Sequence, residues 1–336
     1  MKKRIGMLAV VVLVFGFTLM GCGAFTKVEK ISGYLSMAQI VGRSAEGPVP
    51  LAVKVNLDNN WENLLSVINS SGVFVNLDLS SSNMTNKEFN PGSNGSRYIV
   101  SLVLPDVATS IAGDFDIFTS LRNISFSASA DLGGMNPFVG CTSLTFKTRG
   151  RGDLSTIENG RALVRGTELI SYPSASGDIT FNDITAIGRS AFNRTSLESI
   201  NLPAVTNIGI MAFRECESLH TLNIPSTVSI DNSALANTGD VTHTIIAGQR
   251  FETIAANMFE GVNKRKNVTI KVPQSEVENI TAMRDAFRGR GWNEGNFVVA
   301  AGQNRTIVEN NWWGRSERTV WVSNLNNNIN ITFEGY

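Results

Sequence analysis

The feature that most constrains the fold is a short pattern that recurs about every 22 residues. The clearest copy runs from Ile208 to Pro225, with Ile-Gly-x-x-Ala-Phe in its first half and Leu-x-Ile-Pro in its second. A related copy begins near Ile187, and a more divergent one begins at Ile230. A fixed period of this length is typical of a solenoid, in which each repeat buries its apolar face against its neighbours.

The strands of these repeats can be located by their short, alternating apolar residues. They fall at Leu102–Leu104, Ile124–Phe126, Leu144–Phe146, Ile200–Leu202, Leu222–Ile224, Thr244–Ile246 and Val268–Ile270. Stacked in parallel at about 4.8 Å per strand, roughly seven repeats would form one ladder on the order of 35 Å long. We therefore predict an α/β-type leucine-rich-repeat solenoid with a short parallel sheet over residues 101–273.

The flanking segments lack the period and are predicted to cap the two ends, which a solenoid needs. In the N-terminal cap, residues 51–100, a strand is followed by a helix that Asn60 would cap and Gly72 would end. Its apolar face would consist of Trp61, Leu64, Leu65 and Ile68. The C-terminal cap, residues 274–336, should begin with a helix at the capping box Ser275–Glu278 and end in strands.

One segment interrupts the repeats. Two apolar runs between Ile157 and Pro173 flank the dipeptide Arg165-Gly166. A glycine-containing turn between two such runs is typical of a β-hairpin. We therefore predict a hairpin inserted in the array.

The N-terminus has the composition of a targeting segment. Residues 1–21 begin with Lys2-Lys3-Arg4 and continue as an apolar run, and Leu19-Met20-Gly21-Cys22 resembles a bacterial lipobox. In that class the segment is cleaved before the cysteine, so we expect lipid on Cys22, membrane attachment through that lipid, and a tether over residues 22–50. The alternative is a simple secretory signal with a chance cysteine.

The repeat residues resemble those of a known family, the BspA-like (treponemal-type) leucine-rich repeats. Ile208 to Pro225 is the best match, with Cys216 at the family's cysteine position, and the hairpin segment resembles the family's recurrent hairpin. The resemblance covers about Leu102 to Pro273 and implies a surface-exposed or periplasmic lipoprotein that adheres to host matrix proteins or to other bacteria. The repeat at Ala191–Leu197 lacks one residue and the cysteine, so we expect it to be irregular.

Cys141 and Cys216 occupy the same place in two copies of the repeat. Repeats several turns apart cannot bring their Cα atoms within the roughly 7 Å that a disulfide requires. We expect two small buried thiols that fill the repeat interior.

The chemistry of an enzyme is hard to find in this chain. His220 and His243 are the two histidines, and they do not have zinc-ligand spacing. There is no nucleophile elbow and no phosphate-binding loop. We therefore predict no catalytic residues, no metal and no cofactor. With 29 basic and 29 acidic residues, no strong field favours nucleic acid.

Two further signals have a functional and a structural interpretation. Arg151-Gly152-Asp153 is an integrin-type tripeptide, but three-residue motifs arise readily by chance, and we favour a simple turn. The C-terminal tryptophans could form a platform for a glycan or peptide, or fill the cap, and we favour the cap. They are Trp292, Trp312, Trp313 and Trp321.

The sequence thus predicts a non-enzymatic, lipid-anchored protein of the bacterial cell envelope that binds a protein partner through its repeat surface. An adhesion role toward host matrix or bacteria follows from the family resemblance alone. The alternative is a structural or assembly lipoprotein facing the periplasm. Both are favoured over a hydrolytic enzyme.

Overall fold

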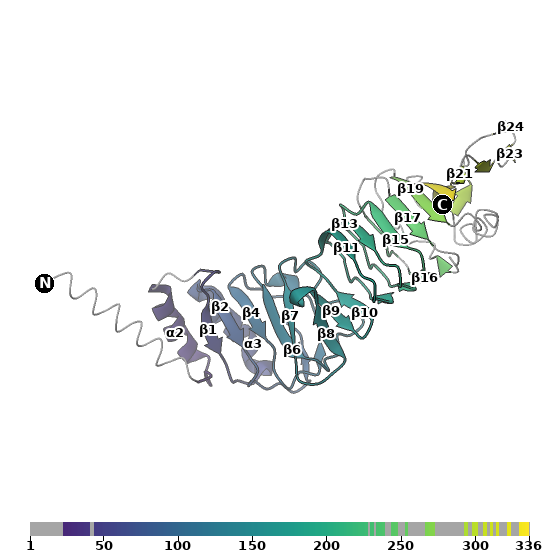
Figure 1. Cartoon of the computed structure of the whole chain (residues 1–336). Helices are drawn as coiled ribbons and strands as arrows, with labels where there is room; N and C mark the ends of the chain where they lie inside the picture. The colour runs from purple at the N-terminus through teal and green to yellow at the C-terminus, as the bar shows by residue number, and fades with distance from the viewer. Residues whose placement is uncertain are drawn as a thin grey trace. The chain divides into compact units, whose positions relative to one another are not determined.

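The chain divides into two compact units (Figure 1). The computed structural model describes residues 23–40, 44–227, 229–231 and 233–238, and beyond residue 238 it describes strands only. The first unit comprises the chain up to Gly133 together with Ser143–Ser155, and the second comprises Gly134–Thr142 and the chain from Thr156 onward.

The first unit is organised on a five-stranded sheet in which every neighbouring pair is parallel. Its strands, in spatial order, are β1 (Val49–Ala52), β2 (Val75–Asp78), β4 (Ile99–Val103), β6 (Asn123–Ser127) and β7 (Thr145–Arg149). A second, two-stranded sheet pairs β3 (Glu88–Phe89) with β5 (Ser110–Ile111), also in parallel. Strands were predicted at the positions of β4, β6 and β7, and these predictions are confirmed.

The core of this unit is a row of apolar side chains across the five strands. Leu51, Leu77, Leu102, Ile124 and Phe146 are register partners from β1 to β7. Each is at most 4% exposed. Burial of each aliphatic or aromatic side chain stabilises the fold by about 1.5–3 kcal/mol. Because each strand contributes one residue to this row, the apolar positions recur in the sequence once per strand.

Helix α3 (Leu57–Ser71) lies where the sequence predicts one, and its buried face contains the four expected residues. Its N-cap is Asn56, whose Oδ1 accepts a 2.9 Å hydrogen bond from the Asp58 N–H, so the prediction of Asn60 was wrong. Asn60 lies inside the first turn and donates from Nδ2 to the Asn56 carbonyl. Gly72 ends the helix with φ of 65°, as predicted.

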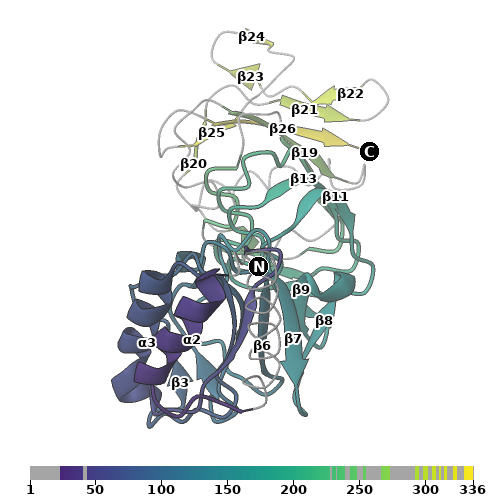
Figure 2. The ribbon, with the colours of Figure 1, turned by 90° about the vertical axis from the view of Figure 1, so that its left-hand side faces the viewer.

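Helix α2 (Glu29–Ile40) lies within the interval 22–50 that the sequence predicts to be a tether. Val28, Ile31 and Leu35 are at most 2% exposed, so this helix is packed and the interval is not a free linker throughout. α2 lies beside α3 (Figure 2). Phe25, just before α2, donates its N–H to the Ala52 carbonyl and covers the open edge of β1. The first unit is thus closed at its edge strand, where unpaired backbone groups would otherwise remain.

The second unit holds two larger sheets. The first, in spatial order, is β18 (Thr253–Ile254), β16 (Ser229–Ile230), β14 (Asn207–Ile208), β12 (Ala186–Ile187), β10 (Glu168–Ser171), β9 (Ala162–Arg165) and β8 (Leu154–Ile157). The main path of the second is β11 (Ser176–Thr180), β13 (Ser196–Asn201), β15 (Thr221–Ile224), β17 (His243–Ala247), β19 (Lys266–Val272), β26 (Ile329–Gly335), β21 (Val298–Ala301) and β22 (Arg305–Ile307). The remaining elements are η1 (Phe115–Ile117), η2 (Glu158–Gly160), β20 (Trp292–Glu294), β23 (Asn310–Asn311), β24 (Gly314–Arg315) and β25 (Trp321–Ser323).

The prediction of one continuous ladder of seven strands was wrong. Three of the predicted strands belong to the five-stranded sheet, which ends at β7, and the other four belong to the sheet that starts at β11. The predicted hairpin is confirmed and lies in the chain between the two ladders: β9 and β10, which follow β7 and precede β11, pair antiparallel around Gly166. β10 then pairs in parallel with β12, so the hairpin starts a new parallel series and does not simply interrupt the old one.

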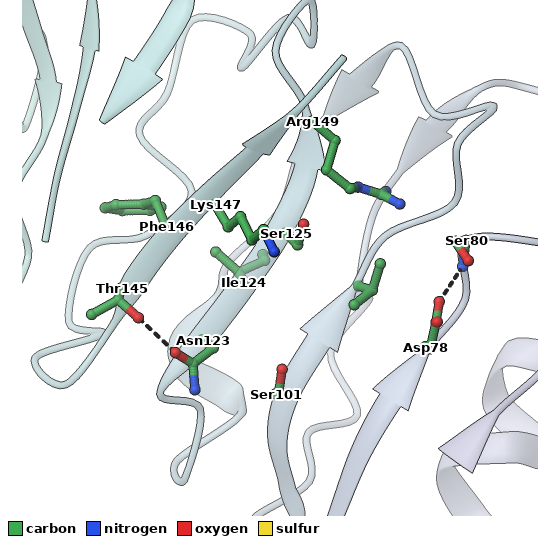
Figure 3. Close-up of a pocket in the computed structure, with 11 residues that line it drawn as sticks. Asp78, Ser80, Ser101, Asn123, Ile124, Ser125, Thr145, Phe146, Lys147 and Arg149 are labelled. Atoms are coloured by element: carbon green, nitrogen blue, oxygen red, sulfur yellow. Dashed lines mark hydrogen bonds between the residues drawn. The ribbon is translucent and has the colours of Figure 1, made fainter. Parts of the chain in front are cut away.

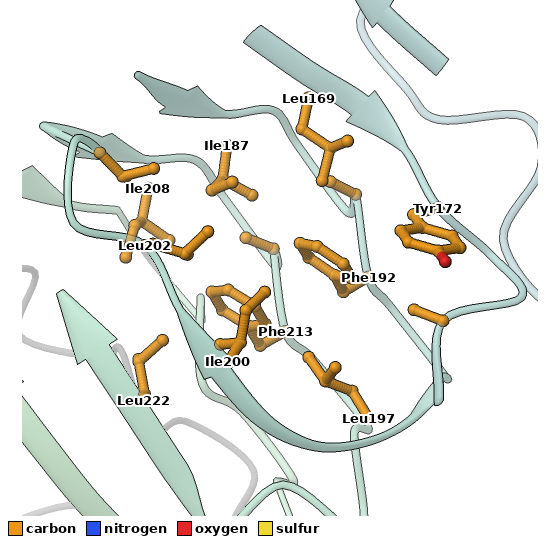
Figure 4. Packing of buried hydrophobic residues seen from close by; sticks show 14 of the residues in the cluster. Leu169, Tyr172, Ile187, Phe192, Leu197, Ile200, Leu202, Ile208, Phe213 and Leu222 are labelled. Carbon is orange, nitrogen blue, oxygen red and sulfur yellow. The ribbon is translucent and has the colours of Figure 1, made fainter. Parts of the chain in front are cut away.

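The core of the second unit repeats one aromatic position from repeat to repeat (Figure 4). The rings of Phe192 and Phe213 stack with centroids 5.2 Å apart and planes 7° apart. The ring centroid of Tyr172, at the end of the hairpin, lies 6.0 Å from that of Phe192, and Tyr172 is 1% exposed. Offset aromatic pairs add about 0.5–1.5 kcal/mol beyond their burial. The hairpin therefore closes this core on one side.

The repeat at Ala191–Leu197 pairs regularly with the repeat that follows it, despite its missing residue and cysteine. β12 pairs with β14, and β13 with β15, without a shift in register. Thr195 takes the place of the cysteine: its N–H donates to the Phe192 carbonyl at 3.2 Å, as the N–H of Cys216 does to Phe213. The expected irregularity is found on the other side of β13, whose pairing with β11 shifts register between Leu197 and Ser199.

The C-terminal segment contributes strands to the second sheet. β26 pairs in parallel with β19, and β25 pairs antiparallel with β26, close to the strands predicted there. The predicted helix at Ser275 and the side chains of the four C-terminal tryptophans lie outside the described residues.

Candidate interaction surface

The outward face of the five-stranded sheet carries a polar hollow of about 490 Å³. It forms because strand residues alternate between the two faces, so the apolar row fills the core while the residues between point outward. Figure 3 shows Asp78 on one side of the hollow and Lys147 and Arg149 on the other. The lining residues are Asp78, Ser80, Ser101, Val103, Asn123, Ile124, Ser125, Thr145, Phe146, Lys147 and Arg149.

A single register row crosses the floor of the hollow. Asp78 on β2 is the partner of Val103 on β4, which is the partner of Ser125 on β6, which in turn is the partner of Lys147 on β7. The two middle residues are short, whereas the outer two carry opposite charges. The floor is therefore low, with an acid on one side and a base on the other.

Side-chain contacts border the hollow towards the two ends of the strands. At one end the Thr145 hydroxyl donates to Asn123 Oδ1 at 2.7 Å. At the other, Arg149 reaches across the sheet: its Nη2 donates to the Leu104 carbonyl at 2.6 Å, and its Nη1 lies 2.6 Å from Asp106 Oδ1. The Arg149 charge is thus already paired.

A second hollow, also of about 490 Å³, lies beside the start of α3. Its lining includes Asn56, Asn60 and Asn83. The first two amides are engaged in the helix cap described above, and the backbone of Asn83 pairs with Val55 and Leu57. These polar groups are explained by the local fold.

The tripeptide Arg151-Gly152-Asp153 lies in an exposed turn of the first unit. A Cβ atom on Gly152 would collide with the backbone of Ala128, whose carbonyl also accepts the Leu154 N–H at 3.0 Å. The glycine is therefore required by packing, which accounts for one of the three residues without any ligand. An integrin role for the tripeptide stays a prediction.

The thiols of Cys141 and Cys216 are free and buried, as the sequence predicts. Burial raises the pKa of the Cys216 thiol to about 11. Because the thiolate is the reactive form, this residue is protected from nucleophilic and redox chemistry at neutral pH. Cys22, the expected lipid site, lies outside the described residues.

Metal-binding groups are not found among the described residues. These residues contain no group of histidine, cysteine and carboxylate side chains placed to hold a metal ion. His220 is half-buried, with Nδ1 3.1 Å from the Thr221 hydroxyl, and the side chain of His243 is outside the described part. Among the described helices, none has the length and hydropathy needed to span a membrane.

Comparison with known proteins supports the repeat assignment. Residues 185–289 match the BspA type leucine-rich repeat region, in six copies. This part of the chain therefore carries BspA-type leucine-rich repeats, which confirms the resemblance seen in the sequence. The matched region begins at β12, so the parallel strands of the first unit lie outside it.

A search of solved structures found the pneumococcal vaccine antigen PcpA, at 11% identity and a TM-score of 0.33. The similarity covers 70% of this chain and 75% of that one, and it is too distant to support an argument about function. No curated protein matched the chain. Leucine-rich repeats are typically binding scaffolds without enzyme activity, and they commonly present a surface to a protein partner.

Proposed function

We propose that this protein is a lipid-anchored binding protein of the bacterial cell envelope, in which stacked repeats form a solenoid that holds a protein partner. The observation that carries the proposal is the outward face of the parallel sheet in the first unit. It is broad, polar and open, and it joins hydroxyl, amide and charged groups from four strands. A surface of this kind suits an extended contact with another macromolecule more than the enclosure of a small substrate.

The lipid anchor is proposed from the lipobox-like sequence that ends at Cys22. Growth with radiolabelled palmitate tests it directly. The native chain should incorporate label and fractionate with membranes, and Cys22→Ala should do neither. Label on the Cys22→Ala chain would show that the anchor is elsewhere.

The binding role is tested with the full chain purified in detergent. Immobilised fibronectin, laminin and collagen, and intact bacterial cells, serve as probes. Saturable binding to one of them supports adhesion, and binding to none of them contradicts it. Protease treatment of intact cells then separates surface display from the periplasmic alternative, because a chain that faces the periplasm stays protected.

A further inference from the structure

We propose that the hollow on the five-stranded sheet binds an extended polypeptide segment that carries one acidic and one basic side chain, lying across the strands. This deepens the proposed function, on which it rests, by assigning the surface and the chemistry of the partner. The residues that would select the segment are Asp78 and Lys147.

The two charges are available to a ligand. Lys147 is exposed and forms no ion pair with the described residues. Asp78 uses Oδ1 to accept the Ser80 N–H at 2.8 Å, and its carboxylate has no cationic partner in the described part of the chain. Arg149, by contrast, is neutralised by Asp106. The hollow therefore presents one unpaired charge of each sign.

The spacing of the charges fits a polypeptide. Asp78 and Lys147 occupy the same register row on strands that are three positions apart, which is about 14 Å at 4.8 Å per strand. An extended chain advances about 3.3 Å per residue, so side chains at positions i and i+4 are about 13 Å apart and on the same face. A segment with an acidic and a basic side chain at that spacing can therefore pair with Lys147 and Asp78 at the same time.

The shape of the hollow sets the direction of the segment. Towards the ends of the strands it is bordered by the Asn123–Thr145 pair and by the Arg149–Asp106 pair. The row itself is open, because Ala52 follows Asp78 on the edge strand β1 and the floor residues Val103 and Ser125 are short. The segment would therefore cross from β2 to β7.

A glycan fits these observations less well. Phe146 lines the hollow but is only 4% exposed, with its ring 6.5 Å from that of Phe126. No aromatic face is thus offered for a sugar to stack on within this surface. A glycan with acidic groups could form an ion pair with Lys147, but its negative charge would be repelled by the Asp78 carboxylate.

The test is selection from a random 12-residue phage-displayed peptide library on the full chain immobilised in detergent. The expected result is enrichment of peptides with Asp or Glu four positions from Lys or Arg. Synthetic copies of the selected peptides are then measured by fluorescence polarisation. Replacing Lys147→Gln or Asp78→Asn should weaken binding about two- to fivefold each, the range for an exposed charge pair.

Two further variants complete the design. Ser101→Trp fills the floor without changing a charge and should abolish binding, whereas Lys30→Gln, on the exposed side of α2, should change nothing. The Asp78→Asn change keeps an oxygen that can accept the Ser80 N–H, so the fold is retained. Failure to enrich charge-paired peptides, or equal affinity for wild type, Asp78→Asn and Lys147→Gln, overturns the proposal.

The result can be separated from that of the proposed function. Binding of a matrix protein that is insensitive to Asp78→Asn, Lys147→Gln and Ser101→Trp would support adhesion and reject this site. Charge-dependent peptide binding without binding to any matrix protein or bacterial cell would support this site and reject the adhesion role. Heparin is included as a probe, and Lys147-dependent heparin binding without peptide selection would assign the hollow to an acidic glycan instead.

Discussion

The Cys216 thiol donates a hydrogen bond to the carbonyl oxygen of Phe192, 2.9 Å away in the preceding repeat. Its sulfur also lies 3.3 Å from the hydroxyl of Thr195, which holds the equivalent place in that repeat. Both residues are buried. The thiol of Cys216 thus satisfies a carbonyl inside the core. Cys141 makes the equivalent backbone contact, because its N–H donates to the Phe138 carbonyl at 3.2 Å, as the N–H of Cys216 does to Phe213.

Replacing Cys216 by Ala should therefore destabilise the second unit by about 1–2 kcal/mol, since it leaves the Phe192 carbonyl without this donor and creates a small void. Cys216→Thr should cost less, because threonine already fills this position at Thr195 and Thr238. Thermal or urea unfolding measures both. Equal losses for Ala and Thr would show that the hydrogen bond contributes nothing.

The stability of the second unit should depend on pH through Glu215. The Arg194 side chain donates to its carboxylate at 2.8 Å and holds the pKa of Glu215 below its ordinary value of 4.5. A lowered pKa in the folded state contributes stability that is present above the unfolded value of 4.5 and is lost as pH falls through the folded value.

The midpoint of unfolding should fall less steeply below pH 4.5 in Glu215→Gln than in the native chain. Glu198→Gln serves as the control, because Glu198 is exposed and forms no ion pair with the described residues. Parallel pH profiles for the native chain and Glu215→Gln would contradict the role of the Arg194 contact.

The period, the strand positions and the hairpin were predictable because each leaves an alternating or glycine-marked pattern in the sequence. The division into two sheets was not, because the hairpin has the same local signature whether it interrupts a ladder or starts one. Only the long-range pairing of β10 with β12 decides between these.

Two local errors have a chemical explanation. The repeat at Thr195 looked defective because its cysteine was missing, yet threonine supplies a buried hydroxyl of similar size. The signal that could have revealed this is Phe-x-x-Thr at the place of Phe-x-x-Cys. Helix α2 has a weak apolar period, and its burial follows from the open edge of β1 that it helps to cover. The charged row from Asp78 to Lys147 was not predicted, because β2 lies in the segment assigned to a cap.

Met211 adopts a left-handed backbone conformation, with φ of 58°, immediately before Ala212. Ser190 and Ser233 do the same in the neighbouring repeats, with φ of 54° each. This conformation costs a residue with a side chain roughly 1–2 kcal/mol, whereas glycine adopts it freely. Met211→Gly should therefore stabilise the fold by up to about 1 kcal/mol, after the larger entropy of glycine in the unfolded chain is subtracted.

The control for Met211→Gly is Ser199→Gly, in the extended strand β13, where the same change should destabilise by about 0.5–1 kcal/mol. Both are read from the midpoint of thermal unfolding. A loss of stability in both variants would mean that the Met211 side chain contributes more than its backbone strain removes.

Gly152→Ala should destabilise the first unit strongly, because the added Cβ has no room against Ala128 and the surrounding backbone must shift. Gly150→Ala is the control for packing: a Cβ there meets nothing within 4 Å, although Gly150, unlike Gly152, has a positive φ of 74°. It should cost only the backbone term of about 1–2 kcal/mol. If the two variants unfold at the same midpoint, the packing explanation of Gly152 is wrong.

Asp153→Glu separates the structural from the functional interpretation of Arg151-Gly152-Asp153. The substitution leaves Gly152, and hence the contact with Ala128, intact, so the unfolding midpoint should fall much less than in Gly152→Ala. Integrin recognition requires the shorter acid, so a functional tripeptide predicts reduced attachment of mammalian cells to surfaces coated with the variant. Because packing already accounts for the glycine, we expect attachment to be unchanged, and a reduction with a normal midpoint would establish the tripeptide as a ligand.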